Sequence, residues 1–161
     1  MASTINVNNI AEATSGSGVQ IPGHVIQCVR TYVASSSVIQ TTATSFTASG
    51  ITASITPKAS GNLILIDCTL PMVDCVSDTI WMKMYQLIAG GSYAVMAGAQ
   101  DYQMGIQSAS RWDPAVFGGS YTATSTSQLT YQPYFRSSGG GNVMLVHDSS
   151  SYSLTLTEIA Q

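Results

Sequence analysis

The sequence predicts an all-β protein, a sandwich of two antiparallel sheets, and three observations lead to this fold class. From residue 24 onward, Val, Ile, Tyr and Thr alternate with polar residues. Clusters of Gly, Ser, Asn and Pro bound these runs at the short, regular spacing typical of sandwich turns. Helix patterns are nearly absent, because even the Met- and Leu-rich stretch 80–88 alternates its side chains between two faces.

The first 20 residues differ in composition from the rest. A weakly alternating start gives way to Ala-Thr-Ser-Gly-Ser-Gly at 13–18, which cannot bury enough apolar surface to order itself. We therefore expect residues 1–20 to form an extended N-terminal arm, in which Ile5, Val7 and Ile10 attach to a neighbouring subunit. The Pro22-Gly23 turn then leads into one β-sandwich domain, residues 21–161.

Each expected strand begins at a run of alternating apolar residues and ends at the next turn signal. Both faces of 79–88 carry large apolar groups, so this strand is buried on both sides or faces a partner subunit. Ala89-Gly90-Gly91-Ser92 then forms a hairpin loop, and Gly139-Gly140-Gly141-Asn142 joins two paired strands in the same way. In chain order, the expected strands are 24–33, 39–47, 51–56, 62–70, 79–88, 92–97, 102–107, 116–121, 128–136, 143–147 and 152–159.

Charge is unusually scarce in this chain. Its 161 residues include five Lys/Arg and eight Asp/Glu, which is 8% charged residues, against about a quarter in an average soluble domain. Assembly is the expected way for such a chain to stay soluble, because small hydroxyl side chains suit closely packed subunit contacts where an unpaired charge would be unfavourable. Nucleic acid is not an expected partner, since the five cations are scattered: Arg30, Lys58, Lys83, Arg111 and Arg136.

The N-terminus has neither the basic start nor the apolar run of a secretory signal, so we expect the chain to be made and kept in a cytosol before assembly. No apolar run approaches the length of a membrane span, and no membrane insertion is expected. Cys28, Cys68 and Cys75 are odd in number and lack Cys-x-x-Cys spacing, which argues against a disulfide framework or a zinc site. We expect all three to be small buried side chains.

The sequence predicts no metal, no cofactor and no catalytic residues. Asp67, Asp74 and Asp78 are of the residue type that binds Ca²⁺, but their spacing matches no defined loop, and a polar loop between two buried strands explains them better. His24 and His147 lie on expected strands without a nucleophile elbow or a paired carboxylate nearby. We therefore expect the protein not to be an enzyme.

Carbohydrate contact is an alternative for the segment 100–114. Aromatic rings stack on sugar C–H surfaces while neighbouring amides and carboxylates bind the hydroxyls. Core packing or a trimer interface would use the same aromatic residues, and we rank core packing first. The candidate residues for glycan or receptor contact are Asp101, Tyr102, Gln103, Arg111, Trp112 and Asp113.

Three segments together resemble the β-sandwich modules of virion proteins from tailed bacteriophages, particularly fibre-like and appendage proteins of marine and cyanobacterial phages. They are Gly18-Val-Gln-Ile-Pro-Gly-His-Val-Ile-Gln, Ser54-Ile-Thr-Pro-Lys-Ala-Ser-Gly-Asn-Leu-Ile-Leu-Ile and Ser151-Tyr-Ser-Leu-Thr-Leu-Thr-Glu-Ile-Ala. The similarity extends from about residue 19 to the C-terminus. It implies a jelly-roll-like sandwich, commonly a homotrimer, preceded by a segment that anchors to the particle.

The chain departs from the commonest form of that family, because only a short arm precedes Pro22. The resemblance therefore implies a bacteriophage virion structural protein that is either a small tail-associated appendage or a capsid decoration protein. Its expected partners are further copies of itself, other capsid or tail proteins and a host-surface glycan, and its expected location is the virion. The alternative function is a carbohydrate-binding, lectin-like module.

Overall fold

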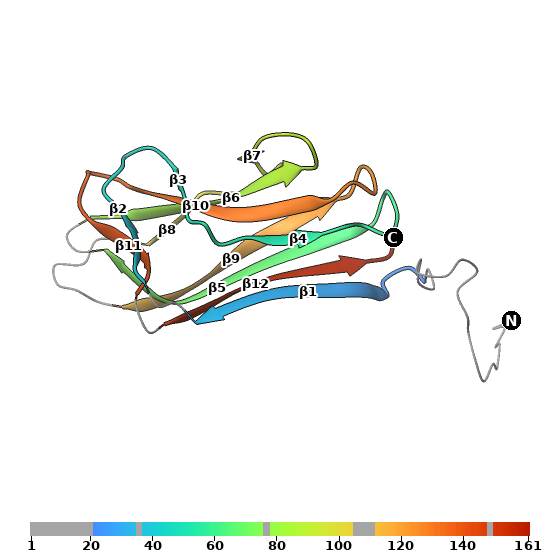
Figure 1. The fold of residues 1–161 in the computed structure, drawn as a ribbon, viewed down its shortest axis with the longest axis horizontal. Coiled ribbons are helices and arrows are strands. Elements are labelled where there is room, and N and C mark those ends of the chain that lie inside the picture. Colours follow the sequence, from blue (N-terminus) through green and yellow to red (C-terminus); the bar gives the residue numbers. More distant parts are fainter. Residues whose placement is uncertain (1–20, 35–36, 76–77, 105–111, 148–149) are drawn as a thin grey trace, which may run out of the picture.

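The computed structural model describes residues 21–34, 37–75, 78–104, 112–147 and 150–161. Two antiparallel sheets pack face to face in this part of the chain, which confirms the predicted all-β sandwich (Figure 1). The expected arm at 1–20, with Ile5, Val7 and Ile10, lies outside the described residues. The division into arm and body therefore stays a prediction.

The first sheet is built around the long strand β5 (Leu63–Cys75). On one side, β5 pairs with β12 (Ser151–Ile159), which in turn pairs with β1 (Val25–Ala34). On its other side it pairs with β9 (Asp113–Thr122). Two short strands, β11 (Val143–Val146) and β2 (Ile39–Thr41), extend the sheet at the far end of β5.

The second sheet is built around the pair β10 (Leu129–Ser137) and β6 (Ile80–Ile88). The short strands β3 (Thr47–Ala48) and β4 (Ala53–Ile55) pair with the outer edge of β10. On the opposite edge, β7 (Ala94–Val95) and β8 (Tyr102–Met104) pair with β6.

The strand connections are those of a jelly roll. The first sheet has the order β1-β12-β5-β9, and the second has β3 and β4, then β10, then β6, then β7 and β8. The chain therefore crosses between the sheets after β2, after β4, after β5, after β8, after β9 and after β10, which produces the two Greek keys of this architecture.

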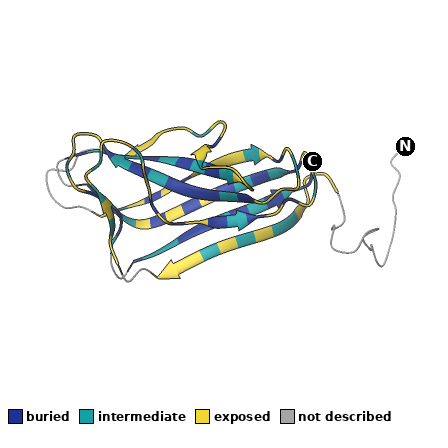
Figure 2. Cartoon of the chain, turned by 45° about the horizontal axis from the view of Figure 1, so that its top comes forward, coloured by how far each residue is buried: buried dark blue, intermediate teal, exposed yellow. Residues whose placement is uncertain are grey.

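The core lies between the inner faces of the two sheets. Side chains along each strand alternate between this core and the outside, so buried and exposed residues alternate in Figure 2. On β5 the buried residues include Ile64, Ile66 and Leu70, and on β6 they include Met82 and Met84, all at most 1% exposed. Large aliphatic and Met side chains thus fill the sandwich.

The expected strands 39–47 and 62–70 have different bounds in the structure. The expected strand 39–47 is wrong in extent, because β2 ends at Thr41 and β3 begins only at Thr47. The expected end of a strand at Leu70, with a polar loop after it, is also wrong. Strand β5 continues through the exposed Pro71 to Cys75, and a register shift between Leu70 and Val73 accommodates the proline, which has no N–H to donate.

The expected hairpin loop at Gly139-Gly140-Gly141-Asn142 is wrong. It connects β10 in the second sheet to β11 in the first sheet, so it crosses the edge of the sandwich. The hairpin expected at 89–92 is confirmed, because β6 and β7 pair antiparallel, with Tyr85 opposite Val95. The turn contains Gly90 at a φ of 81°, a conformation that favours glycine.

The prediction that all three cysteines are buried is wrong for Cys28, which is exposed. It lies on β1, an edge strand whose outward side chains are not covered by the second sheet; most of the strand is exposed or half-buried (Figure 2). Cys68 and Cys75 are buried as expected. Burial raises the pKa of the Cys68 thiol to about 12.

Candidate interaction surfaces

The outer face of the first sheet is flat, poor in charge and rich in hydroxyl groups. Residues directly opposite each other on neighbouring strands point to the same side of a sheet, so the pairing register defines this face. We call it the hydroxyl face, and its residues are Cys28, Arg30, Tyr32, Leu63, Leu65, Asp67, Thr69, Val116, Gly118, Ser120, Thr122, Ser153, Thr155, Thr157 and Ile159.

Large apolar side chains are exposed on the hydroxyl face. Tyr32 is 60% exposed and Val116 is 58% exposed, and they lie at the two ends of one row across the sheet. Ser153 and Thr69 lie between them in that row. The two exposed apolar side chains of this row are thus separated by two small polar residues.

The next row of the hydroxyl face carries its two charged side chains. Arg30 lies opposite Thr155, Thr155 lies opposite Asp67, and Asp67 lies opposite Gly118. The Arg30 guanidinium carbon lies 5.4 Å from the centroid of the Tyr32 ring. Within the described parts of the chain, neither Arg30 nor Asp67 forms an ion pair.

Gly118, in the middle of the hydroxyl face, lies too close to β5 to carry a side chain. A Cβ atom at this position would lie 1.8 Å from the backbone oxygen of Ile66 on β5. No other residue fits without a shift of the backbone of β9 or β5. This requirement could not be predicted from the sequence, because it depends on the close approach of two strands.

The outer face of the second sheet is different, because aromatic rings and cations cover it. On β6, Ile80, Met82 and Met84 point into the core, while the residues between them are half-buried on the outside. The strand is therefore buried on its inner face and half-buried on its outer face, which agrees in part with the expected strand buried on both sides. Contact with a partner subunit, the other alternative, stays a prediction. We call this surface the aromatic face, and its residues are Phe46, Trp81, Lys83, Tyr85, Tyr93, Tyr134 and Arg136.

The rings of the aromatic face pack against one another across β6 and β10. Tyr85 and Tyr134 stack with ring centroids 3.9 Å apart at an interplanar angle of 19°. Tyr93 packs on Tyr134 at 6.1 Å, and Phe46 packs on Tyr85 at 6.3 Å. Phe46 and Tyr93 come from loops, so these contacts also fix the loops to the sheet.

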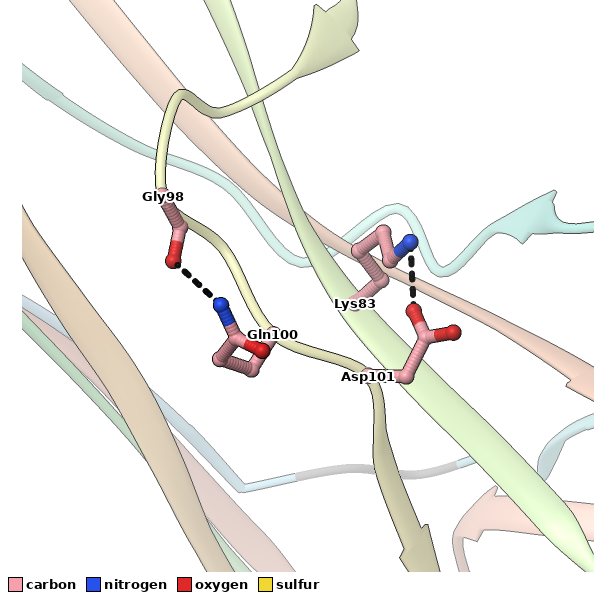
Figure 3. A network of polar contacts seen from close by, with 4 residues as sticks. All are labelled: Lys83, Gly98, Gln100 and Asp101. Carbon is pink, nitrogen blue, oxygen red and sulfur yellow. Dashed lines mark hydrogen bonds and ion pairs between the residues drawn. The ribbon is translucent and has the colours of Figure 1, made fainter.

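Both cations of the aromatic face have partners within the chain. The Arg136 guanidinium carbon lies 4.9 Å from the centroid of the Trp81 ring and 5.3 Å from that of Phe46. Lys83 lies 5.5 Å from the Phe46 centroid and forms an ion pair with Asp101, in the segment where Gln100 donates to the Gly98 carbonyl (Figure 3). These contacts satisfy the two charges without another molecule.

The structure places three of the predicted glycan residues at the β8 edge of the second sheet. Asp101 binds Lys83, and the exposed Gln103 lies opposite Trp81. Tyr102 points the other way, since its ring stacks on Phe117 of β9 with centroids 5.7 Å apart. The exposed fraction of Tyr102 is 37%.

The other predicted glycan residues belong to the first sheet or to its approach. Trp112 is 42% exposed, and its ring lies 3.9 Å from the His147 ring. Asp113 is half-buried at the start of β9, opposite Val73. Arg111 lies outside the described residues. The five candidates that the structure describes therefore come from two different sheet edges, and the role of the set in glycan contact stays a prediction.

Two buried carboxylates have structural roles that the sequence did not indicate. Asp78 accepts hydrogen bonds from the amides of Thr79, Gly139 and Gly141 and from the Ser137 hydroxyl. The Ser137 hydrogen bond is the largest of several that lower the pKa of Asp78 to about 2, and they outweigh the opposing effect of burial.

Glu158 is 0% exposed and connects three segments. Its Oε1 accepts from the Lys58 amide at 2.8 Å and from Asn62 Nδ2 at 2.7 Å, and its Oε2 accepts from Gln27 Nε2 at 2.5 Å. Three donors are thus matched with the two carboxylate oxygens at the end of the sandwich where β12 ends.

The described residues contain no group of three or more His, Cys, Asp or Glu side chains that could hold a metal ion. Of the three aspartates weighed as Ca²⁺ ligands, Asp67 is exposed on the hydroxyl face, while Asp74 and Asp78 are buried. In the same part of the chain, no helix has the length and apolar character to cross a membrane.

A cavity of about 430 Å³ opens beside the β6–β7 hairpin. Its walls are mostly apolar or small side chains, and they include no pair of groups suited to acid–base or nucleophilic chemistry. Gln86 contributes an amide that is already used, since Nε2 donates to the Tyr131 hydroxyl at 3.1 Å. The lining residues are Gln86, Ile88, Gly91, Ser92, Ala94, Val95, Ala97 and Tyr121.

No protein-family model matches the chain, and neither does any curated protein. Among solved structures, the chain has a distant similarity to a chain in the structure of infectious bursal disease virus Gx strain, with a TM-score of 0.36 and 11% sequence identity. The alignment covers 100% of this chain and 42% of that chain. This chain thus spans less than half the length of its structural relative.

Proposed function

We propose that this jelly roll is a structural protein of a bacteriophage virion that assembles with copies of itself into a homotrimer. The observation that carries the proposal is the hydroxyl face, which combines exposed apolar anchors, small hydroxyl side chains and few charges. The jelly-roll order of the strands and the resemblance of three segments to phage virion modules support the same function.

The hydroxyl face is large enough to form part of a subunit contact. It spans the four strands β1, β12, β5 and β9. With neighbouring strands about 4.8 Å apart and about nine residues of about 3.4 Å along each, the face covers roughly 600 Å² in projection. A standard interface buries about 800 Å² per partner, and each copy in a trimer makes two such contacts, so surfaces beside the hydroxyl face contribute the remaining area.

The arm gives such an assembly its attachment to a particle. The body begins beside its own C-terminus, because the Gly23 amide donates to the Ala160 carbonyl at 2.8 Å and the Ala160 amide donates to the His24 carbonyl at 2.9 Å. An arm that leaves from this fixed point carries Ile5, Val7 and Ile10 to a capsid or tail protein. In this proposal the body is either a tail-associated appendage or a capsid decoration protein.

The mass in solution tests the self-assembly directly. Light scattering coupled to size exclusion is expected to give the mass of three chains over a wide range of concentrations. A Tyr32→Ser, Val116→Ser variant is expected to dissociate, because it removes the two exposed anchors. A Val95→Ser variant is the matched control, since Val95 is 47% exposed on β7, away from the hydroxyl face.

Attachment by the arm is tested separately. Deletion of residues 2–18 is expected to leave the folded body and its mass per assembly unchanged, because the arm supplies no core-sized apolar set. The same deletion is expected to abolish incorporation into particles. Loss of the folded body in this variant would refute the division into arm and domain.

A lectin-like function is the second candidate, and the exposure of two aromatic rings favours it. Trp112 and Tyr102 are 42% and 37% exposed, and Asp101 and Gln103 provide polar groups near Tyr102. Glycan binding that is lost on Trp112→Ala, with the mass of the assembly unchanged, would support this candidate. We expect no hydrolysis of host polysaccharide by the purified protein, and turnover would oppose both candidates.

A further inference from the structure

The two charged residues of the hydroxyl face, Arg30 and Asp67, have opposite charges but form no ion pair within the described part of the chain. Arg30 and Asp67 lie in one row on β1 and β5, and Thr155 of β12 lies between them. Strands two positions apart are about 10 Å apart, so the two side chains stand on opposite sides of Thr155. Both residues are exposed, and the Arg30 guanidinium lies over the Tyr32 ring of its own strand.

The uncharged residues around Arg30 and Asp67 determine what happens to these two charges when the face is covered. Apart from this pair, the face consists of apolar, hydroxyl, thiol and glycine residues. A contact that buries the face also buries both charges, and an unpaired buried charge is strongly unfavourable. Association is therefore favourable only where the Arg30 guanidinium of one copy meets the Asp67 carboxylate of another. These two groups can form a bidentate, charge-assisted pair of hydrogen bonds.

We infer that Arg30 of one copy binds Asp67 of the next copy, around a rotation axis that runs parallel to the strands above Thr155. This inference rests on the proposed self-assembly and names the residues that direct it. Rotation about such an axis brings the β1 side of one copy against the β5 side of its neighbour. In a threefold ring each copy gives Arg30 to one neighbour and Asp67 to the other, so the ring closes with every charge paired.

The small residues of the same row fit this arrangement. Thr155 lies at the axis, and Gly118 follows Asp67 in the row, so neither presents a bulky group between approaching copies. The exposed anchors Tyr32 and Val116 lie one row away, on either side of the axis. The contact thus has apolar anchors next to a central charge pair, as specific interfaces do.

The aromatic face is less suited to the same role. Its cations are already satisfied, since Lys83 pairs with Asp101 and Arg136 lies between Trp81 and Phe46. Its rings are half-buried against each other. A second copy would gain less by covering this face than by covering the hydroxyl face, where the charges have no ion pair in the described structure.

Charge reversal on the full chain tests the pairing. Arg30→Asp and Asp67→Arg each place like charges at the contact, and each is expected to raise the concentration of half-dissociation by about tenfold or more. The double variant Arg30→Asp, Asp67→Arg restores opposite charges and is expected to return to within about threefold of the wild type. Lys58→Asp is the matched control, because it reverses an exposed cation outside the hydroxyl face.

Light scattering gives the mass of each variant, and thermal unfolding reports its fold. An oligomeric wild type whose mass is unchanged by the single reversals overturns the pairing, as does a double variant that stays dissociated; both results leave the proposed self-assembly standing. A fall in melting temperature at constant mass also overturns it, because the charges then act within one chain. A wild type that is monomeric at every concentration overturns the proposed function itself.

Discussion

Gly141 and Asp78 are held so closely together that any side chain at position 141 would displace the Asp78 carboxylate. The Gly141 amide donates to Asp78 Oδ2 at 2.7 Å, and a Cβ atom on Gly141 would lie 2.9 Å from the same oxygen. This contact closes the loop that carries the chain from the second sheet to the first. The glycine-rich segment is thus a corner of the sandwich organised by a carboxylate.

Substitution of Asp78 is expected to destabilise the fold. Asp78→Asn replaces one acceptor oxygen by an amide group that faces the donors from Ser137, Gly139 and Gly141. Unsatisfied buried donors of this kind are each unfavourable, and we expect a loss of about 2 kcal/mol in the free energy of unfolding. Urea denaturation measures it, and Asp101→Asn, at an exposed ion pair, is expected to change stability by under about 1 kcal/mol.

The stability contributed by Asp78 is expected to disappear in acid. Its hydrogen bonds hold the folded pKa at about 2, below the value of about 3.9 in an unfolded chain. Stability from a lowered carboxyl pKa is fully present above the unfolded pKa and is lost as the pH falls through the folded pKa. The difference in unfolding free energy between wild type and Asp78→Asn should therefore shrink between about pH 4 and pH 2. A difference that stays constant over this range would show that the charge of Asp78 is not involved.

Glu158→Gln is expected to loosen the end of the sandwich where β12 meets the 56–62 loop. Both carboxylate oxygens accept from donors, so a glutamine amide must point its NH₂ group at another donor. We expect a loss of about 2 kcal/mol in unfolding free energy. Faster amide hydrogen exchange at Lys58 would locate the effect. Exchange unchanged at this amide would mean that the network tolerates an amide.

Gly118→Ala is expected to be the most damaging single substitution on the hydroxyl face. Its methyl group would overlap the Ile66 carbonyl, so β9 must separate from β5 and lose ladder hydrogen bonds. A loss of about 3 kcal/mol or more is expected, by analogy with overpacking in cores. Ser120→Ala, an exposed position of the same face and strand, is the control and is expected to leave the melting temperature nearly unchanged.

The symmetry of the assembly can be read from a mixture of two variants. Arg30→Asp and Asp67→Arg carry complementary charges, so an equimolar mixture can alternate perfectly only in a ring with an even number of copies. A trimer must keep one contact between like charges. We therefore expect the mixture to recover only part of the trimer population, whereas full recovery at the mass of two chains would indicate a dimer.

Local alternation was enough to predict the sandwich and most of its strands. The buried Ile80, Met82 and Met84 follow from a period-two pattern that any strand must show. Pro71 misled the prediction because a proline usually ends a strand, and only the bulge after Leu70 allows β5 to continue. The length of β5 therefore depends on its partner strand, which a single sequence does not display.

The functional surfaces were harder to predict, because they arise from register and from distant contacts. Arg30, Thr155 and Asp67 are far apart in sequence, and only the pairing of β1, β12 and β5 sets them in one row. The same holds for Asp78 and Gly141. The predicted glycan site combines residues that are close in sequence, but Tyr102 and Trp112 lie at the edges of different sheets.

The mass of the intact protein in solution, measured by light scattering across a dilution series, shows whether the chain assembles through the hydroxyl face. We expect a persistent assembly of three chains of 16.9 kDa each, which dissociates when the anchors or charges of the hydroxyl face are changed. A mass of one chain at every concentration would contradict it. The exposed Tyr32 and Val116 would then need another partner, and glycan binding would become the leading function.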